Sequence, residues 1–190
     1  MKALLRIAHL IDALNERVGR AVQWLVLVVV LISAGNAVVR KLFDFSSNAF
    51  LEIQWYLFAA VFLLAAGYTL KHNEHVRIDV VAGRFGKRTQ AWIDIIGGVL
   101  FLMPMAVLIL YFSWPSFVSS FVSMEHSGNP GGLLLWPAKL LIPAGFLLLL
   151  LQGIAETIKR VGFLAGIEPP EAPPAEHAML CQKPGAHNAG

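Results

Sequence analysis

The side chains that could do chemistry gather most densely in one short polar stretch, which holds His72, Glu74, His75 and Asp79. Imidazoles and carboxylates bind metal ions or transfer protons, and His75 and Asp79 lie one helical turn apart, so these two side chains could converge. A metal site needs three or four converging ligands, however. We therefore prefer the simpler interpretation that these are polar residues at a membrane boundary, with Asp79 paired to Arg77 or to another neighbour.

No other pattern in the sequence points to catalysis. All six histidines lie outside the long apolar runs, whereas a membrane cytochrome needs axial histidines inside its helices. The glycine-rich stretch 128–132 lacks the Lys-Ser/Thr pair of a phosphate-binding loop. The single cysteine, Cys181, cannot form an internal disulfide. The sequence thus predicts a protein that is not an enzyme and has no cofactor or metal.

Four long apolar runs make up most of the chain, and the polar segments lie between and beside them. The chain has 190 residues, a mean hydropathy of +0.65 and only 14% charged residues, and is therefore too apolar for an ordinary soluble domain. A helix crosses the bilayer core with about 20 apolar residues, and a helix satisfies its own backbone groups in lipid. We predict an all-α membrane protein with four transmembrane helices, at Val22–Val39, Ile53–Leu70, Trp92–Trp114 and Leu133–Ala155.

Basic residues gather on one side of these spans. Residues 1–20, the connection between spans two and three, and the C-terminal flank together hold twelve of the fifteen Lys and Arg residues. Cytoplasmic segments carry the excess of Lys and Arg, so both termini and the second connection are expected in the cytoplasm. There the basic residues face anionic headgroups, and we expect a lipid bilayer but no nucleic acid as a partner.

Two amphipathic segments flank the spans. In residues 1–20, apolar side chains recur at helical spacing, which predicts either an N-terminal helix in the cytoplasmic interface or a short helix packed on a partner. Ile78, Val81, Ala82 and Phe85 predict an amphipathic cytoplasmic linker helix between spans two and three. The expected organisation is an interfacial helix at 1–20, a four-helix transmembrane domain at 21–162 and a disordered cytoplasmic tail at 163–190.

Several residues mark span ends and bends. Pro104 predicts a kink in span three, which we expect to end near Trp114, and Pro137 suits the first turn of span four. The third connection is expected to be a flexible hairpin. Glu52 and Lys139 lie near span ends, where the cost of a charge is low. We expect them to anchor or pair, inside the chain or with a partner, rather than to line a transport pathway.

Three segments in order resemble one family, the small membrane subunit, DctQ type, of the tripartite ATP-independent periplasmic (TRAP) transporters. An acidic and aromatic entry opens span two, a Gly-Tyr and His-Val-Arg-Ile-Asp segment follows it, and an Asn-Pro-Gly-Gly and Trp-Pro-Ala-Lys segment opens span four. Residues 134–135 are Leu-Leu where one branch of the family often has Leu-Pro. The residues that carry the resemblance are Glu52, Trp55, Gly67, Tyr68, His75, Arg77, Asp79, Asn129, Gly131, Gly132, Trp136, Pro137, Lys139, Pro143, Gly145 and Gln152.

The resemblance implies a bacterial inner-membrane complex with two partners. A large membrane subunit of about a dozen spans would carry the sodium and substrate sites, and a periplasmic substrate-binding protein would deliver an organic acid. The small subunit would scaffold the large one and help dock the binding protein. Two alternatives stay open at this point: a self-sufficient oligomeric channel or carrier, and a membrane enzyme that uses the segment His72–Asp79.

Overall fold

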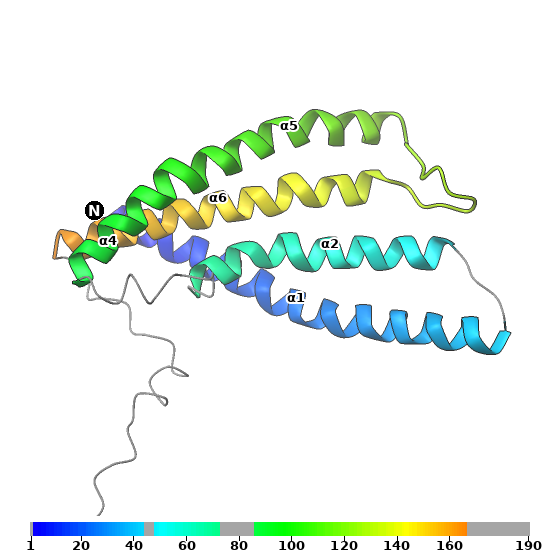
Figure 1. Ribbon diagram of the computed structural model, residues 1–190. Helices are drawn as coiled ribbons and strands as arrows, with labels where there is room; N and C mark the ends of the chain where they lie inside the picture. Colours follow the sequence, from blue (N-terminus) through cyan, green and yellow to red (C-terminus); the bar gives the residue numbers. More distant parts are fainter. Residues whose placement is uncertain (1, 44–47, 73–85, 167–190) are drawn as a thin grey trace, which may run out of the picture.

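The computed structural model describes residues 2–43, 48–72 and 86–166, and these residues are helical apart from short connections. Four of the described helical segments are long and apolar enough to cross a membrane, which confirms the predicted fold class. The predicted linker helix, with His75, Arg77 and Asp79, lies outside the described residues. The elements are α1 (Lys2–Phe43), α2 (Asn48–Lys71), α4 (Lys87–Gly97), the π-helix η1 (Gly98–Leu102), α5 (Met103–Val122) and α6 (Trp136–Leu164) (Figure 1).

The helices form a broad, open arrangement with α6 at its centre. Helix α6 packs against α1, α2, α4 and α5, whereas α5 packs mainly against α6. In Figure 1, α5, α6, α2 and α1 follow one another across the view. The most apolar part of the α5 segment is accordingly only 6% buried, against 28% in α6. Most of the apolar surface therefore faces outward, where lipid or another membrane protein can cover it.

Helix α1 joins the predicted interfacial helix and the first span. It runs for 42 residues without a break at residue 20. Its N-terminal part is amphipathic, as predicted, but the polar side faces the protein: Asp12 and Asn15 are buried, while Leu10 is 70% exposed. Asp12 and Asn15 bond to Gln152 of α6, and Glu16 pairs with Lys71 at the end of α2, so this part of the helix stays on the bundle.

The third span bends and is longer than the sequence indicated. The wide turns of η1 end at Leu102, two residues before Pro104, and the N–H of Met103 donates to Gly98 O. Proline provides no N–H for the next regular helical bond. The π-turns therefore lie directly before the position where the regular backbone hydrogen-bond pattern is interrupted. We expected the span to end near Trp114. Instead α5 continues through Pro115 to Val122. Phe121 on this last stretch contacts Trp136 of α6 edge to face, with 5.5 Å between ring centroids.

Helix α6 begins as its sequence predicts. It starts at Trp136 with Pro137 in the first turn, where a proline loses no helical hydrogen bond. Gly145 lies against α2, and a Cβ added there would be 2.7 Å from Leu63 Cβ and from Leu63 O. The absence of a side chain therefore allows α2 and α6 to approach closely, as small residues do in membrane helix pairs.

Candidate functional site

A buried carboxylate near the start of α2 holds the connection between α5 and α6. Glu52 is only 4% exposed. Its Oε1 accepts hydrogen bonds from the Ser127 hydroxyl and from Asn129 Nδ2 (2.8 Å), and its Oε2 accepts one from Leu133 N–H (2.7 Å). All three donors come from the connection. Hydrogen bonds to an ionised group are about twice as strong as neutral ones, so this carboxylate fixes the shape of a segment that we expected to be flexible.

Two further residues of α2 extend this contact along the helix. Asn48 Nδ2 donates to Pro130 O (3.2 Å), and the Tyr56 hydroxyl donates to Leu134 O (3.1 Å). Asn48, Glu52 and Tyr56 are spaced by four residues and therefore share one face of α2. We call these three residues the loop clamp. The four-residue spacing is visible in the sequence, but nothing in the sequence marks Asn48 or Tyr56 as contacts of the connection between α5 and α6.

The turn at the end of this connection depends on glycine. Gly132 N–H donates to Asn129 O at 2.9 Å, and Gly131 between them has φ of 74°. Proline followed by a positive-φ glycine is the pattern of a type II turn. Two backbone bonds close the connection behind the turn, from Ser127 N–H to Leu133 O and from Leu135 N–H to Glu125 O, both 2.9 Å.

An ion pair fixes the other end of the connection. Lys139 Nζ lies 2.5 Å from Glu125 Oε2, which joins the second turn of α6 to the residues after α5. The hydrogen bond from the Lys139 ammonium holds the pKa of the Glu125 carboxyl below its ordinary value. Both Glu52 and Lys139 thus pair inside the chain, which is one of the two roles expected from the sequence.

A second group of polar residues crosses between α1 and α6 at the opposite end of the bundle. Gln152 of α6 is fully buried. Its Oε1 accepts from Asn15 Nδ2 (2.8 Å), its Nε2 donates to Asp12 Oδ1 (2.7 Å), and Lys159 Nζ lies 3.2 Å from Asp12 Oδ2. We call these four residues the polar network. Apolar packing alone provides little preference for one helix rotation in lipid, whereas these bonds require particular faces to meet.

Ion pairs surround the polar network. Glu16 of α1 lies 2.6 Å from Lys71 Nζ and 3.1 Å from His72 Nε2, both at the end of α2. Arg160 of α6 lies 3.6 Å from Asp94 of α4. Of the four polar residues His72, Glu74, His75 and Asp79, only His72 lies within the described residues, and its ring nitrogen is next to the Glu16 carboxylate. Among the described residues, no group of three or more His, Cys, Asp or Glu side chains could hold a metal ion.

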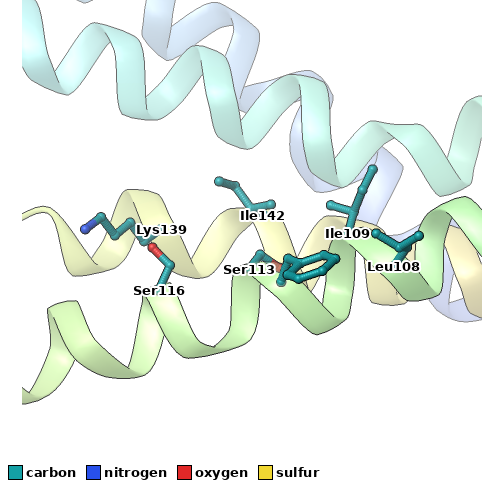
Figure 2. A pocket seen from close by; sticks show the side chains of 7 residues that line it. Leu108, Ile109, Ser113, Ser116, Lys139 and Ile142 are labelled. Carbon is teal, nitrogen blue, oxygen red and sulfur yellow. The ribbon is translucent and has the colours of Figure 1, made fainter.

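A mostly apolar cavity of about 370 Å³ lies between α5 and α6. Figure 2 shows that its walls come from these two helices, with Lys139 and Ser116 toward one end and Leu108 toward the other. The polar groups on its wall are two serines and one lysine, and that lysine pairs with Glu125. The cavity therefore presents no nucleophile–base pair of side chains.

The comparison with known families decides the identity. The family model described as "Tripartite ATP-independent periplasmic transporters, DctQ component" matches residues 29–162. The chain belongs to the DctQ family. It is therefore a small membrane component of a TRAP transporter, a tripartite system with a large membrane subunit and a binding protein, and not an enzyme. Searches of curated proteins and of solved structures found no match.

The matched region of this DctQ protein contains the whole loop clamp and Gln152, while Asp12, Asn15 and Glu16 precede it. The structure brings Glu52, Asn129, Gly131 and Gly132 together at the clamp, and Gly67, Tyr68 and Gln152 near the polar network. Trp55 lies on the exposed side of α2. His75, Arg77 and Asp79 lie outside the described residues. The pairing of Asn15 and Asp12 with Gln152 was not predicted from the sequence. The one feature of the sequence that could have indicated this contact is that two polar residues occur within the apolar pattern of residues 1–20.

Proposed function

We propose that this DctQ protein is the non-catalytic scaffold of a sodium-coupled, binding-protein-dependent transporter that takes up an organic acid. It would hold the large membrane subunit in the bilayer and help to dock the substrate-binding protein. The observation that carries the scaffold role is the open arrangement of the helices. Helix α5 contacts mainly α6 and leaves most of its apolar surface outward, as expected of a component that completes its packing on a partner.

The distribution of charge supports a scaffold rather than a carrier. Two charged side chains near span ends pair within the chain, Lys139 with Glu125 and Arg160 with Asp94. The buried glutamine of the polar network links two helices instead of lining a path. Intramembrane polar groups that serve transport face a water-filled cavity or a bundle interior open to substrate. Here they stabilise helix contacts, which suits a fixed frame against which a partner can move.

The loop clamp supports the docking role. A surface whose shape is already fixed loses less conformational entropy when a partner binds, and so gains affinity. Glu52 fixes the connection through three donors, and the pair of Glu125 with Lys139 fixes its first residues. We propose that this connection faces the periplasm of a bacterial inner membrane, with both termini in the cytoplasm, because basic residues are concentrated on the opposite side.

The test is to remove the chain from cells that keep the other two components. We expect uptake of a labelled organic acid to be lost and to return when the wild-type chain is supplied. Purification of the tagged chain in mild detergent is expected to recover the large subunit in constant ratio. Normal uptake without the chain would contradict the proposal. A chain that purifies alone as an oligomer and conducts solute in liposomes would instead establish a self-sufficient channel or carrier.

A further inference from the structure

One residue at the end of α5 adopts a backbone conformation that its type disfavours. Met124 has φ of 48° and is the only non-glycine residue with positive φ in the part of the chain that the structure describes. Glu125 N–H donates to Ser120 O (3.1 Å) and Met124 N–H to Phe121 O (3.4 Å). This pair of bonds is the Schellman motif, in which the left-handed residue is usually glycine and sometimes asparagine. Methionine with its Cβ is strained in that place.

The side chain of Met124 is also exposed. It is 56% exposed and follows Val122, which is 77% exposed, while the turn that ends α5 continues into polar residues. A glycine would form the same turn without backbone strain and without exposing an apolar side chain. Within the chain, then, methionine at this position is unfavourable on two counts. A contact with something outside the chain is the physical role that such a side chain can serve.

The α5 tip, which we define as Phe121, Val122 and Met124, is placed by the length of its helix at or beyond the edge of the hydrocarbon. The third apolar segment is 35 residues long, so that at 1.5 Å per residue it spans about 52 Å, against about 30 Å for the bilayer core. Trp114 is an exposed aromatic of the kind found at membrane interfaces, and α5 continues from it to Val122. At that height a water-soluble protein can contact the tip.

The α5 tip is continuous with the clamped connection. Glu125, the next residue after Met124, is held by Lys139 and by the backbone of Leu135. The ion pair neutralises the charge beside the tip, so the tip offers an uncharged apolar knob on a fixed support. Such a knob fits an apolar pocket with a polar rim, which is the usual anatomy of a protein–protein hot spot.

We propose that Met124 is an anchor residue through which this subunit docks the periplasmic binding protein of its transporter. The inference rests on the proposed docking function and adds the residue and the chemistry of the contact. The strained turn aims the methionine away from the bundle, and the partner supplies the apolar surroundings that the free subunit lacks.

The experiment measures binding and stability together. The complete complex of the two membrane subunits is placed in nanodiscs, and the fluorescently labelled binding protein of the same transporter is titrated against it. We expect Met124→Gly to weaken binding about tenfold, because truncating an anchor residue has effects of this size, while the thermal midpoint of the complex stays the same or rises as strain is removed. Met124→Leu should restore most of the affinity. Ser123→Ala is the matched control, since it changes the neighbouring polar residue of the same turn.

The outcomes separate this inference from the proposed function. Unchanged affinity for Met124→Gly would overturn the inference, and so would loss of the large subunit from that variant, because the contact would then be within the membrane complex. If the large subunit alone in nanodiscs binds the labelled protein as well as the complete complex does, the docking function itself fails. If the complete complex binds the labelled protein better than the large subunit alone, but Met124→Gly leaves that affinity unchanged, only the assignment of Met124 as an anchor fails.

Discussion

Gln152 of the polar network provides the sharpest test of how the helices are held together. It is fully buried and joins α6 to Asn15 and Asp12 of α1 by bonds of 2.8 and 2.7 Å. Gln152→Leu keeps the approximate volume but removes both bonds. A neutral hydrogen bond contributes about 1 kcal/mol and one to a charged group about 1.5–3 kcal/mol, while interhelical bonds in membranes average only about 0.6 kcal/mol. We expect a loss of about 2 kcal/mol in the free energy of unfolding.

The assay is equilibrium unfolding of the purified subunit in mixed micelles, followed by the fluorescence of its five tryptophans. Thr157→Val is the matched control, because the Thr157 hydroxyl donates to Gly153 O of its own helix at 2.8 Å and, within the described residues, makes no hydrogen bond to another helix. A double-mutant cycle of Gln152→Ala with Asn15→Ala isolates the direct bond, for which we expect a coupling energy of about 1 kcal/mol.

Two results would refute this reasoning. If Gln152→Leu is as stable as the wild type, a buried polar link is not what joins α1 to α6. If the two alanine substitutions are additive within about 0.3 kcal/mol, Asn15 and Gln152 do not interact directly, whatever the cost of each substitution. A loss confined to Thr157→Val would show that the assay reports on α6 itself rather than on its contact with α1.

Three further predictions concern the close packing and the clamp. Gly145→Ala should lower the thermal midpoint of the complex, at a cost of about 1–3 kcal/mol, because the added Cβ would meet Leu63; an unchanged midpoint would mean that α2 and α6 are not in close contact. Glu52→Gln should increase protease cleavage between α5 and α6 while the helical signal in circular dichroism stays constant, because three loop donors lose their carboxylate; equal cleavage would exclude the clamp. Lys139 lowers the pKa of the Glu125 carboxyl. This pair therefore contributes its full stability above the ordinary carboxyl pKa of about 4.3. The contribution is lost as the pH falls through the lower pKa that Glu125 has in the folded protein. Protease protection should therefore persist at pH 5 to 7, roughly one to three units above that reference, and Lys139→Met should remove its dependence on acid.

The four membrane helices could be predicted because their signal is local. A run of apolar residues long enough to cross a bilayer has to be helical, since lipid offers no partner for backbone groups. The start of α6 at Trp136 was equally local, because Pro137 fits only a first turn or a break. The end of α5 was not: Pro115 suggested a stop, but the packing of Phe121 on Trp136 holds the helix to Val122. A proline therefore does not end a helix where a tertiary contact stabilises the residues that follow it.

The partners of the polar residues could not be predicted, because the sequence does not determine how apolar helices rotate about their axes. Helix α2 is apolar around most of its circumference, so no periodicity marks the face that meets α6. The sequence by itself determined the number of spans, their approximate positions and the family. Only the tertiary structure decided that Glu52 binds residues 75 to 81 positions away and that Gln152 reaches Asn15 across 137 positions. In lipid, it is such polar contacts that select one rotation among many of similar apolar energy.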